Sequence, residues 1–268
     1  LTTTVINKLT TAQVAALTTS QVNNMTTDQM VNLTTASVAT LNTDQVVALS
    51  TAQMPNLTSA QIGALSSSQL RAMETADFAK ISTTALSSIT TAALSGLTTA
   101  QMVALTTDQV PLISATQMAA ISTANLAVME TADFAKLTTD AIVALTTAQA
   151  AAITNTQMPV LTTDQLVKME TQDFAALTTA SIVALSTYQM GSLTTAQLKA
   201  LTPTQVVKLE TADLAALTTD QIVGIELSDL ALLTTDQIRG LTTAGPLTGL
   251  TTAQVAALTA AQVASLTT

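Results

Sequence analysis

Residues 9–32 read LTTAQVAA, LTTSQVNN and MTTDQMVN, three octads that repeat one pattern of apolar and polar residues. The octad register holds from residue 1 through residue 240, which gives thirty units. An irregular nine-residue unit occupies 241–249, and octads resume over 250–268. Position 1 is Leu, Ile or Met, position 6 is nearly always a larger apolar residue, and position 5 is most often Gln. These features predict one continuous repeat array.

Each octad carries the sequence signature of a helix N-terminus. Thr at position 2 and Gln at position 5 have the spacing of a capping box, in which each side chain bonds the other residue's backbone N–H. Positions 1 and 6 then have the spacing of a hydrophobic staple. Pro203 stands at position 3, the first helical residue, where proline is favoured. The pattern therefore predicts a short helix in every octad.

The helices must be short because an eight-residue repeat drifts by about 80° on a continuous α-helix, so that no apolar stripe persists. Pro55, Pro111 and Pro159 all stand at position 7, where each disfavours helical geometry in the residue before it. We expect one to one and a half helical turns per octad. A β-solenoid is the alternative, although positions 1 and 6 face the same side of a strand only across a bulge.

One octad buries too little apolar surface to offset the conformational entropy of its own backbone, so the octads must stack on one another. The predicted fold is an all-α solenoid of very short helical turns, with positions 1 and 6 in its core. Gln at position 5 either only caps its helix or also forms a ladder of stacked Gln side chains inside the solenoid. The number of octads in each turn of the solenoid is left open.

The composition excludes several classes of function. The chain has no Cys and no His, which removes thiolate chemistry, the commonest general base and the commonest metal ligands. Charged residues are 9% of the chain and the net charge is −9, which opposes binding to nucleic acid. No apolar run is long enough to span a membrane. We expect no enzyme activity, catalytic residue, cofactor or metal, since a repeated unit offers no unique site.

Five octads depart from the Thr/Gln pattern. METADFAK (73–80 and 129–136), METQDFAA (169–176), LETADLAA (209–216) and IELSDLAL (225–232) place Glu at position 2 and Asp at position 5. The ten carboxylates are those of Glu74, Asp77, Glu130, Asp133, Glu170, Asp173, Glu210, Asp213, Glu226 and Asp229. We interpret these octads as structurally special coils, with Lys80 and Lys136 offsetting Asp77 and Asp133. A ligand or cation site is the alternative, although isolated Glu/Asp pairs lack the six or more oxygens that Ca²⁺ prefers.

The octads LTTAQVAA and LNTDQVVA and the METADF variants resemble the LTTxQV repeat regions of large bacterial secreted or surface proteins, which are described as adhesin-like. This resemblance covers essentially the whole chain and implies an extracellular or cell-surface location. The sequence begins in register and stops within a unit, as expected of a window from a longer array. We therefore expect a structural repeat protein that forms a filament, stalk or matrix element, with itself as partner. The alternative is a module that binds a surface, a polysaccharide or ice through exposed Thr rows.

Overall fold

The computed structural model describes residues 2–266, apart from the side chains of 242–244. The ends of the predicted repeat ranges at residues 1 and 267–268 lie outside the described residues. The chain forms two compact units, Leu1–Ala144 and Leu145–Thr268. The octad register of the sequence continues through residue 144 without a change.

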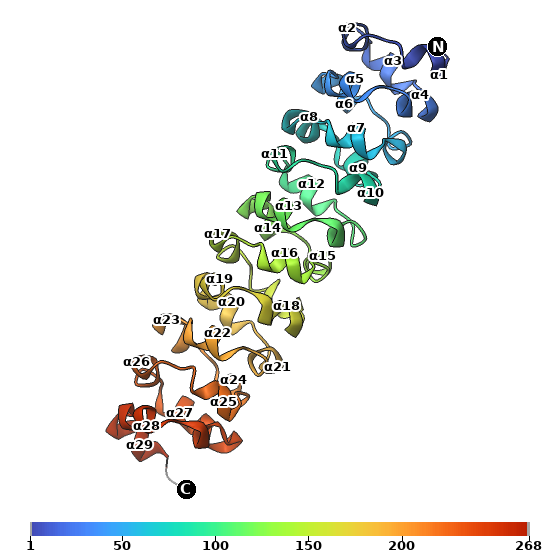
Figure 1. The fold of residues 1–268 in the computed structure, drawn as a ribbon. Helices are drawn as coiled ribbons and strands as arrows, with labels where there is room; N and C mark the ends of the chain where they lie inside the picture. The colour runs from blue at the N-terminus through green and yellow to red at the C-terminus, as the bar shows by residue number, and fades with distance from the viewer. Residues whose placement is uncertain (1, 267–268) are drawn as a thin grey trace. The chain divides into compact units, whose positions relative to one another are not determined.

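The first unit contains sixteen α-helices and two 3₁₀ helices among its described residues (Figure 1). They are α1 (Thr3–Ile6), α2 (Thr11–Ala15), α3 (Thr19–Asn23), α4 (Thr27–Val31), α5 (Thr35–Ala39), α6 (Thr43–Val47), η1 (Met54–Asn56), α7 (Ser59–Gly63), α8 (Ser67–Ala72), α9 (Thr75–Phe78), α10 (Thr83–Leu86), α11 (Thr91–Leu94), α12 (Thr99–Val103), η2 (Val110–Leu112), α13 (Ala115–Ala120), α14 (Thr123–Val128), α15 (Thr131–Phe134) and α16 (Thr139–Val143).

The second unit continues the same pattern over its described residues. Its helices are α17 (Thr147–Ala150), η3 (Met158–Val160), α18 (Thr163–Lys168), α19 (Thr171–Ala176), α20 (Thr179–Val183), α21 (Thr187–Met190), α22 (Thr195–Lys199), α23 (Pro203–Val206), α24 (Thr211–Ala215), α25 (Thr219–Ile222), α26 (Leu227–Leu230), α27 (Thr235–Ala244), η4 (Pro246–Gly249), α28 (Thr252–Ala257) and α29 (Ala260–Ser265).

The octad of α7 shows how one repeat folds. Leu57 and Thr58 are extended, with φ/ψ of −63°/131° and −70°/158°, and Thr58 caps the helix that begins at the next residue. The helix ends at Gly63, and Ala64 keeps right-handed geometry with φ/ψ of −84° and −10°. Two extended residues therefore separate one helix from the next, and the prediction of one short helix per octad is confirmed.

No residue in the described range 2–266 is in a β-strand, so the β-solenoid alternative is wrong. The octads with proline at position 7 differ from the others, although not as predicted, because the residue before each proline remains in a helix. In each of them the segment around Pro55, Pro111 or Pro159 forms a 3₁₀ helix rather than an α-helix. Proline has no N–H for the i→i−4 bond, and the tighter turn does not require that bond at this position.

The irregular nine-residue unit breaks the rule of one short helix per octad. Helix α27 runs for ten residues, from Thr235 across the repeat boundary to Ala244. Gly245 ends it with φ of +94°, a left-handed conformation that glycine adopts without steric cost. The 3₁₀ helix η4 follows at once and leads into the resumed octads.

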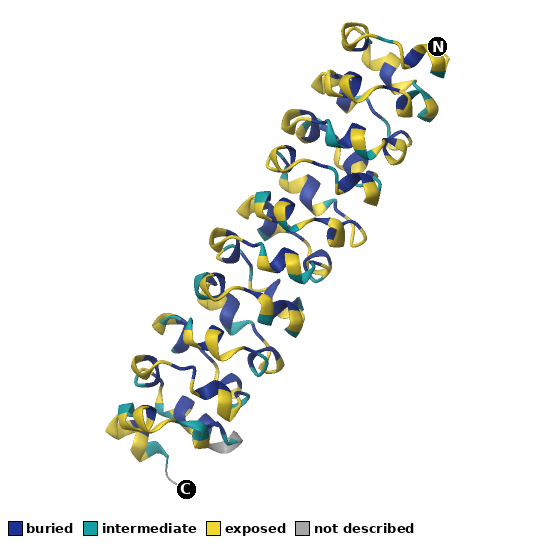
Figure 2. Cartoon of the chain, in the orientation of Figure 1, coloured by how far each residue is buried: buried dark blue, intermediate teal, exposed yellow. Residues whose placement is uncertain are grey.

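The core of each unit is formed by positions 1 and 6, as predicted. Leu33 and Val38, for example, are 4% and 1% exposed, while the Thr residues at position 3 are mostly exposed. In each unit, Figure 2 shows buried segments alternating with exposed ones along the described chain. Position 5 is also buried in most octads, which its polar character alone does not predict.

Contacts between helices define how many octads make one superhelical turn. In the first unit α6 lies against α8 and α7 against α10, and in the second unit α24 lies against α27, each pair three octads apart. Hydrogen bonds from position 5 reach residues 28 to 31 earlier, in the third and fourth preceding octads. Each turn within a unit therefore contains between three and four octads.

Candidate functional site

The capping box predicted from the sequence is present in most octads. In the octad of α7, Gln61 N–H donates to Thr58 Oγ1 at 3.2 Å, and Thr58 N–H donates to Gln61 Oε1 at 2.9 Å. The N-cap residues of complete capping boxes are Thr10, Thr18, Thr26, Asn42, Thr58, Ser66, Thr98, Ser114, Thr146, Thr162, Ser186, Thr194, Thr202, Thr218, Thr234, Thr251 and Thr259. The hydroxyl at position 2 is therefore occupied within its own octad.

The same Gln side chain also bonds the previous superhelical turn. Nε2 of Gln61 donates to the carbonyl oxygens of Met30 and Leu33 at 2.8 Å, and to that of Val31 at 3.3 Å. We call the bond to the residue 28 positions earlier the turn clamp. The Gln donors that make it are Gln45, Gln53, Gln61, Gln69, Gln101, Gln109, Gln117, Gln189, Gln197, Gln205, Gln221 and Gln237.

The nine-residue unit changes the clamp by one residue. Gln254 and Gln262 donate to the carbonyl oxygens of Ile225 and Leu233, which lie 29 positions earlier instead of 28. Both bonds are short, at 2.9 and 2.8 Å. The extra residue of the unit is therefore accommodated by the longer α27 and Gly245, and the acceptor of the clamp is still a position-1 carbonyl.

The Gln amide at position 5 thus forms hydrogen bonds with two backbone segments. Its oxygen accepts from the N-terminus of its own helix. Its nitrogen donates to carbonyls at the end of an earlier helix and just after it, such as those of Met30 and Leu33. The capping prediction is confirmed. The prediction of a Gln ladder is wrong for the clamp octads given above, because there Nε2 donates to backbone carbonyls rather than to another Gln.

Smaller polar residues at position 5 bond the same acceptor. Nδ2 of Asn125 donates to the Leu97 carbonyl at 2.9 Å, and Oγ of Ser181 donates to the Ile153 carbonyl at 2.7 Å. Both acceptors lie 28 residues earlier. The sequence did not predict this role. Its one signal is that position 5 is polar in most octads, and helix capping alone does not require that polar residue to be buried.

The five acidic octads place their two carboxylates in different surroundings. The Glu residues at position 2 are exposed N-cap residues that make no side-chain capping bond. The Asp residues at position 5 are buried, with exposed fractions of 1% to 4%. These are Asp77, Asp133, Asp173, Asp213 and Asp229. The sequence-predicted pairs are therefore one exposed and one buried group, three residues apart in each octad.

Burial is the main reason that the pKa of each of these Asp residues is raised, and the charge of the Glu at position 2 raises each pKa further. The pKa of Asp213 rises to about 6, although the Glu210 backbone N–H opposes the shift. For Asp173 the nearby Thr147 hydroxyl lowers the pKa in part. Even so, neither Asp173 oxygen has a partner within hydrogen-bond geometry.

The predicted role of two lysines is wrong. Lys80 and Lys136 are exposed and form no ion pair with Asp77 or Asp133. Among the described residues, the ion pairs are Lys199–Glu226 at 3.4 Å and Arg239–Asp236 at 3.3 Å. The buried aspartates are therefore not neutralised by basic side chains of their own octads, because these side chains extend into solvent.

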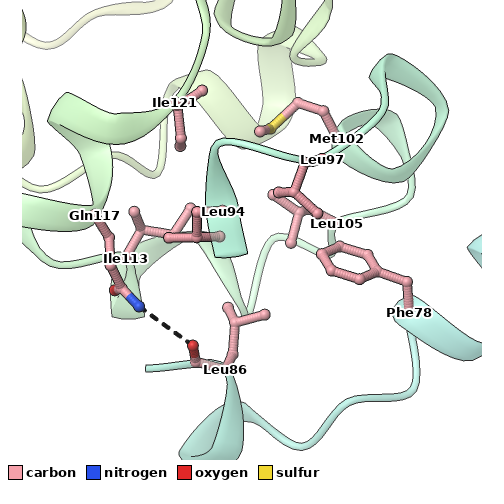
Figure 3. Close-up of a pocket in the computed structure, with 9 residues that line it drawn as sticks. All are labelled: Phe78, Leu86, Leu94, Leu97, Met102, Leu105, Ile113, Gln117 and Ile121. Atoms are coloured by element: carbon pink, nitrogen blue, oxygen red, sulfur yellow. Dashed lines mark hydrogen bonds between the residues drawn. The ribbon is translucent and has the colours of Figure 1, made fainter. Parts of the chain in front are cut away.

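Within residues 2–266, no three acidic side chains come close enough together to hold a metal ion. In the described part of the chain, no helix is long and apolar enough to cross a membrane. An apolar cavity in the first unit, lined by Phe78, Leu94 and Met102 among others, has a volume of about 10 Å³ (Figure 3). Figure 3 shows these side chains pointing into the packed interior. This volume is at the lower limit for one water molecule.

The geometry defines a class of protein: each unit is a helical solenoid of octads, capped within the octad and clamped between turns. The chain belongs to the ALTTAQ repeat family, whose model matches residues 1–27, 22–59, 70–107, 126–163, 166–203 and 206–243. Four of these segments contain both ends of a clamp, as 166–203 does with Gln197 and Met169. A search of curated proteins finds no match.

Proposed function

We propose that the chain is a structural repeat element of an extracellular filament, stalk or matrix. The observation that supports this most is the recurrence of the turn clamp in both units, at a separation of 28 residues or, across the nine-residue unit, 29. Each octad in them bonds only octads close to it in the sequence, so one more octad extends a unit without changing its other contacts. A protein built in this way supplies length and stiffness, which are the properties that a spacer requires.

Self-association belongs to the same proposal. Contacts between copies that repeat head to tail without closing a ring build filaments. The expected partner is therefore a second copy of this chain, or the continuation of the same array. The cell-surface location rests on the resemblance to repeat regions of secreted and surface proteins.

Electron microscopy of the purified chain at near-physiological salt tests the proposal. We expect filaments much longer than one chain, with the short helices lying across the filament axis. Analytical ultracentrifugation over a range of concentrations is the matched solution measurement. Particles of single-chain mass at every concentration would exclude self-association. The remaining structural role for the chain would then be that of a spacer within a longer repeat array.

A surface-binding module is the second candidate, and the exposed Thr residues at position 3 favour it. Thr43, Thr91 and Thr171 are exposed, whereas hydroxyls at position 2 are engaged in capping. Only the position-3 rows are therefore free to meet ice or a polysaccharide. Thr→Val changes at position 3 along one face of a single unit should abolish ice shaping or polysaccharide retention and leave the helical circular dichroism unchanged. Retained binding by the folded variant would exclude this candidate.

A further inference from the structure

Position 5 has one acceptor in the previous turn, whichever side chain occupies it. Gln61, Asn125 and Ser181 differ in length and chemistry, yet each donates to the carbonyl 28 residues earlier, at 2.7 to 2.9 Å. The acceptor is therefore set by the backbone register and not by the side chain. In these three octads, donors of different length reach the same acceptor, whereas the hydroxyl of buried Ser37 bonds Thr34 Oγ1 of its own octad.

Among the buried polar residues at this position, aspartate is the type that lacks a permanent donor, whereas Ala85, Ala93 and Ala141 are buried there without any polar side chain. It has the shape of Asn, but an ionised carboxylate only accepts hydrogen bonds. In the second unit, Asp213 is in register with the carbonyl of Leu185, as Asn125 is with that of Leu97 in the first. When Asp213 is ionised, its carboxylate oxygen and the Leu185 carbonyl oxygen are both acceptors at this register. They can form a hydrogen bond only with a proton between them. Both oxygens of buried Asp173 and Oδ1 of buried Asp229 have no hydrogen-bond partner, which is consistent with a missing proton.

The charges around Asp213 do not favour its ionised form. Its own helix α24 begins at Glu210, whose charge repels it. Helix α21, which packs on α24, carries no charged residue. Helix α27 packs on the other side, and its two charged residues, Asp236 and Arg239, pair with each other in solvent.

The neighbours of Asp173 and Asp229 are similar. Helix α19, which holds Asp173, packs on α17 and α22, and their only charged residue is Lys199. The ammonium of Lys199 pairs with exposed Glu226, the N-cap residue of the helix that holds Asp229. Helices α23 and α28, which pack on that helix, carry no charged residue.

We propose that Asp213, together with Asp173 and Asp229, is a pH-dependent turn clamp. When protonated, the carboxyl O–H donates to the backbone carbonyl oxygen 28 residues earlier and joins the two turns. When the proton is lost to solvent, the carboxylate and the carbonyl repel each other and the joint opens. Asp77 and Asp133 occupy the same position in the first unit.

A proton fits this position better than a metal ion does. Asn125 Nδ2 lies 2.9 Å from its acceptor, and two oxygens at that distance share a proton in a hydrogen bond. Ca²⁺ holds each oxygen at about 2.3–2.6 Å and takes six or more of them. The Glu residue of each acidic octad is exposed, so the buried site offers one carboxylate.

The raised pKa of Asp213, to about 6, supports the proposal and gives its sign. The unfolded chain has an Asp pKa of about 3.9. Between these two values the folded protein binds more protons than the unfolded chain, so stability falls as the pH rises through this range. The clamp makes its full contribution to the free energy of unfolding below about pH 4, and this contribution is lost above about pH 6.

Two variants of Asp213 separate the effects of its charge and its donor. Asp213→Asn keeps a donor at every pH, and Asp213→Ala removes both charge and donor. At about pH 7.5 we expect the Asn variant to melt several degrees above the unmodified protein. At about pH 4.5 this difference should disappear, whereas the Ala variant should melt below the unmodified protein. An Ala variant that is more stable at both pH values would exclude the donor role.

Asp220→Asn is the matched control, because Asp220 is an exposed position-4 residue of the following octad. It should not change the pH dependence of melting. Carbon-detected NMR titration of the unmodified protein checks the proposal without a mutation, and an Asp213 carboxyl that titrates near 4 would overturn it. Adding millimolar CaCl₂ to protein treated with EDTA should leave melting unchanged. A Ca²⁺-dependent rise that Asp213→Asn abolishes would replace the proton with a cation.

Discussion

The choice of Gln at position 5 follows from the two atoms of its amide. In a capping box Glu and Gln are equally suitable at this position, because only an acceptor is required. Gln61 is 1% exposed and must satisfy an N–H in its own octad and carbonyls in an earlier turn. Glu provides only the first of these functions. The turn clamp therefore explains why Gln predominates where the local helix alone would accept either residue.

Gln61→Glu tests this argument with a nearly isosteric change. It keeps the acceptor for Thr58 N–H but removes the side-chain donor to the carbonyls of Met30 and Leu33 and places a buried charge against them. The Met30 carbonyl keeps the backbone N–H of Leu33 at 3.1 Å. We expect a loss of about 3 kcal/mol in the free energy of unfolding at neutral pH, measured by urea denaturation. Gln21→Glu is the control, because Gln21 is exposed and caps Thr18 without a turn clamp. Equal losses in the two variants would contradict the clamp.

The sequence predicts the cap but not the clamp, for a physical reason. A capping box joins residues three apart, so its spacing is visible within one octad. The acceptor of Gln61 Nε2 lies 28 residues away, and its identity depends on how far each octad rotates the chain. The octad pattern does not specify that rotation. Stacking with three octads per turn and stacking with four octads per turn would bury the same positions of the octad. Only the polar character of position 5 indicates that the residue does more than cap.

At the scale of one helix, the acidic octads lack a side-chain cap that most other octads have. Glu74 is the N-cap residue of α9, yet its side chain makes no capping bond. Glu74→Thr supplies the hydroxyl, which should stabilise the first unit by about 1 kcal/mol in urea denaturation. It also removes a charge that raises the pKa of buried Asp77, so NMR titration should show that pKa falling.

Glu74→Gln is the comparison that separates the two effects. It removes the charge without adding the Thr hydroxyl, so the pKa of Asp77 should fall as in Glu74→Thr while the gain in stability is smaller. If the two variants gain the same stability, the missing hydroxyl at position 2 is not what weakens α9.

The irregular unit shows where helix-level prediction fails. Its nine residues and its Gly245-Pro246 pair predict an interruption, which the structure places at the left-handed Gly245. The sequence does not predict that α27 continues for ten residues through the preceding repeat boundary. Leu241 stands at position 1, which is extended in other octads, and is here fully buried within the helix. The extra residue allows the helix to continue while the next position 5 still reaches its clamp acceptor.

At the scale of a whole unit, stability comes from contacts between residues that are close in the sequence. The turn clamps span 28 or 29 residues, and the helix pairs in contact are three octads apart. Unfolding is therefore expected to proceed by neighbouring turns, as in other solenoids, rather than as one event for the entire chain. This arrangement also makes the octad, and not the residue, the unit in which length can change.

Removal of Leu185–Ser192 tests that conclusion in the second unit. The deletion removes one whole octad, so the later position-5 residues up to Gln237 again meet a position-1 carbonyl 28 residues earlier, and the 29-residue clamps of Gln254 and Gln262 are unchanged. We expect a folded protein with unchanged helical circular dichroism per residue and melting lowered by only a few degrees. Removal of residues 185–188 is the matched control, because it shifts the register by four and misaligns each clamp that crosses the cut. That variant should lose several kcal/mol of stability, since each unsatisfied buried group costs about 1–3 kcal/mol. Equal melting of the two deletions would mean that general apolar packing, rather than the clamp register, holds the turns together.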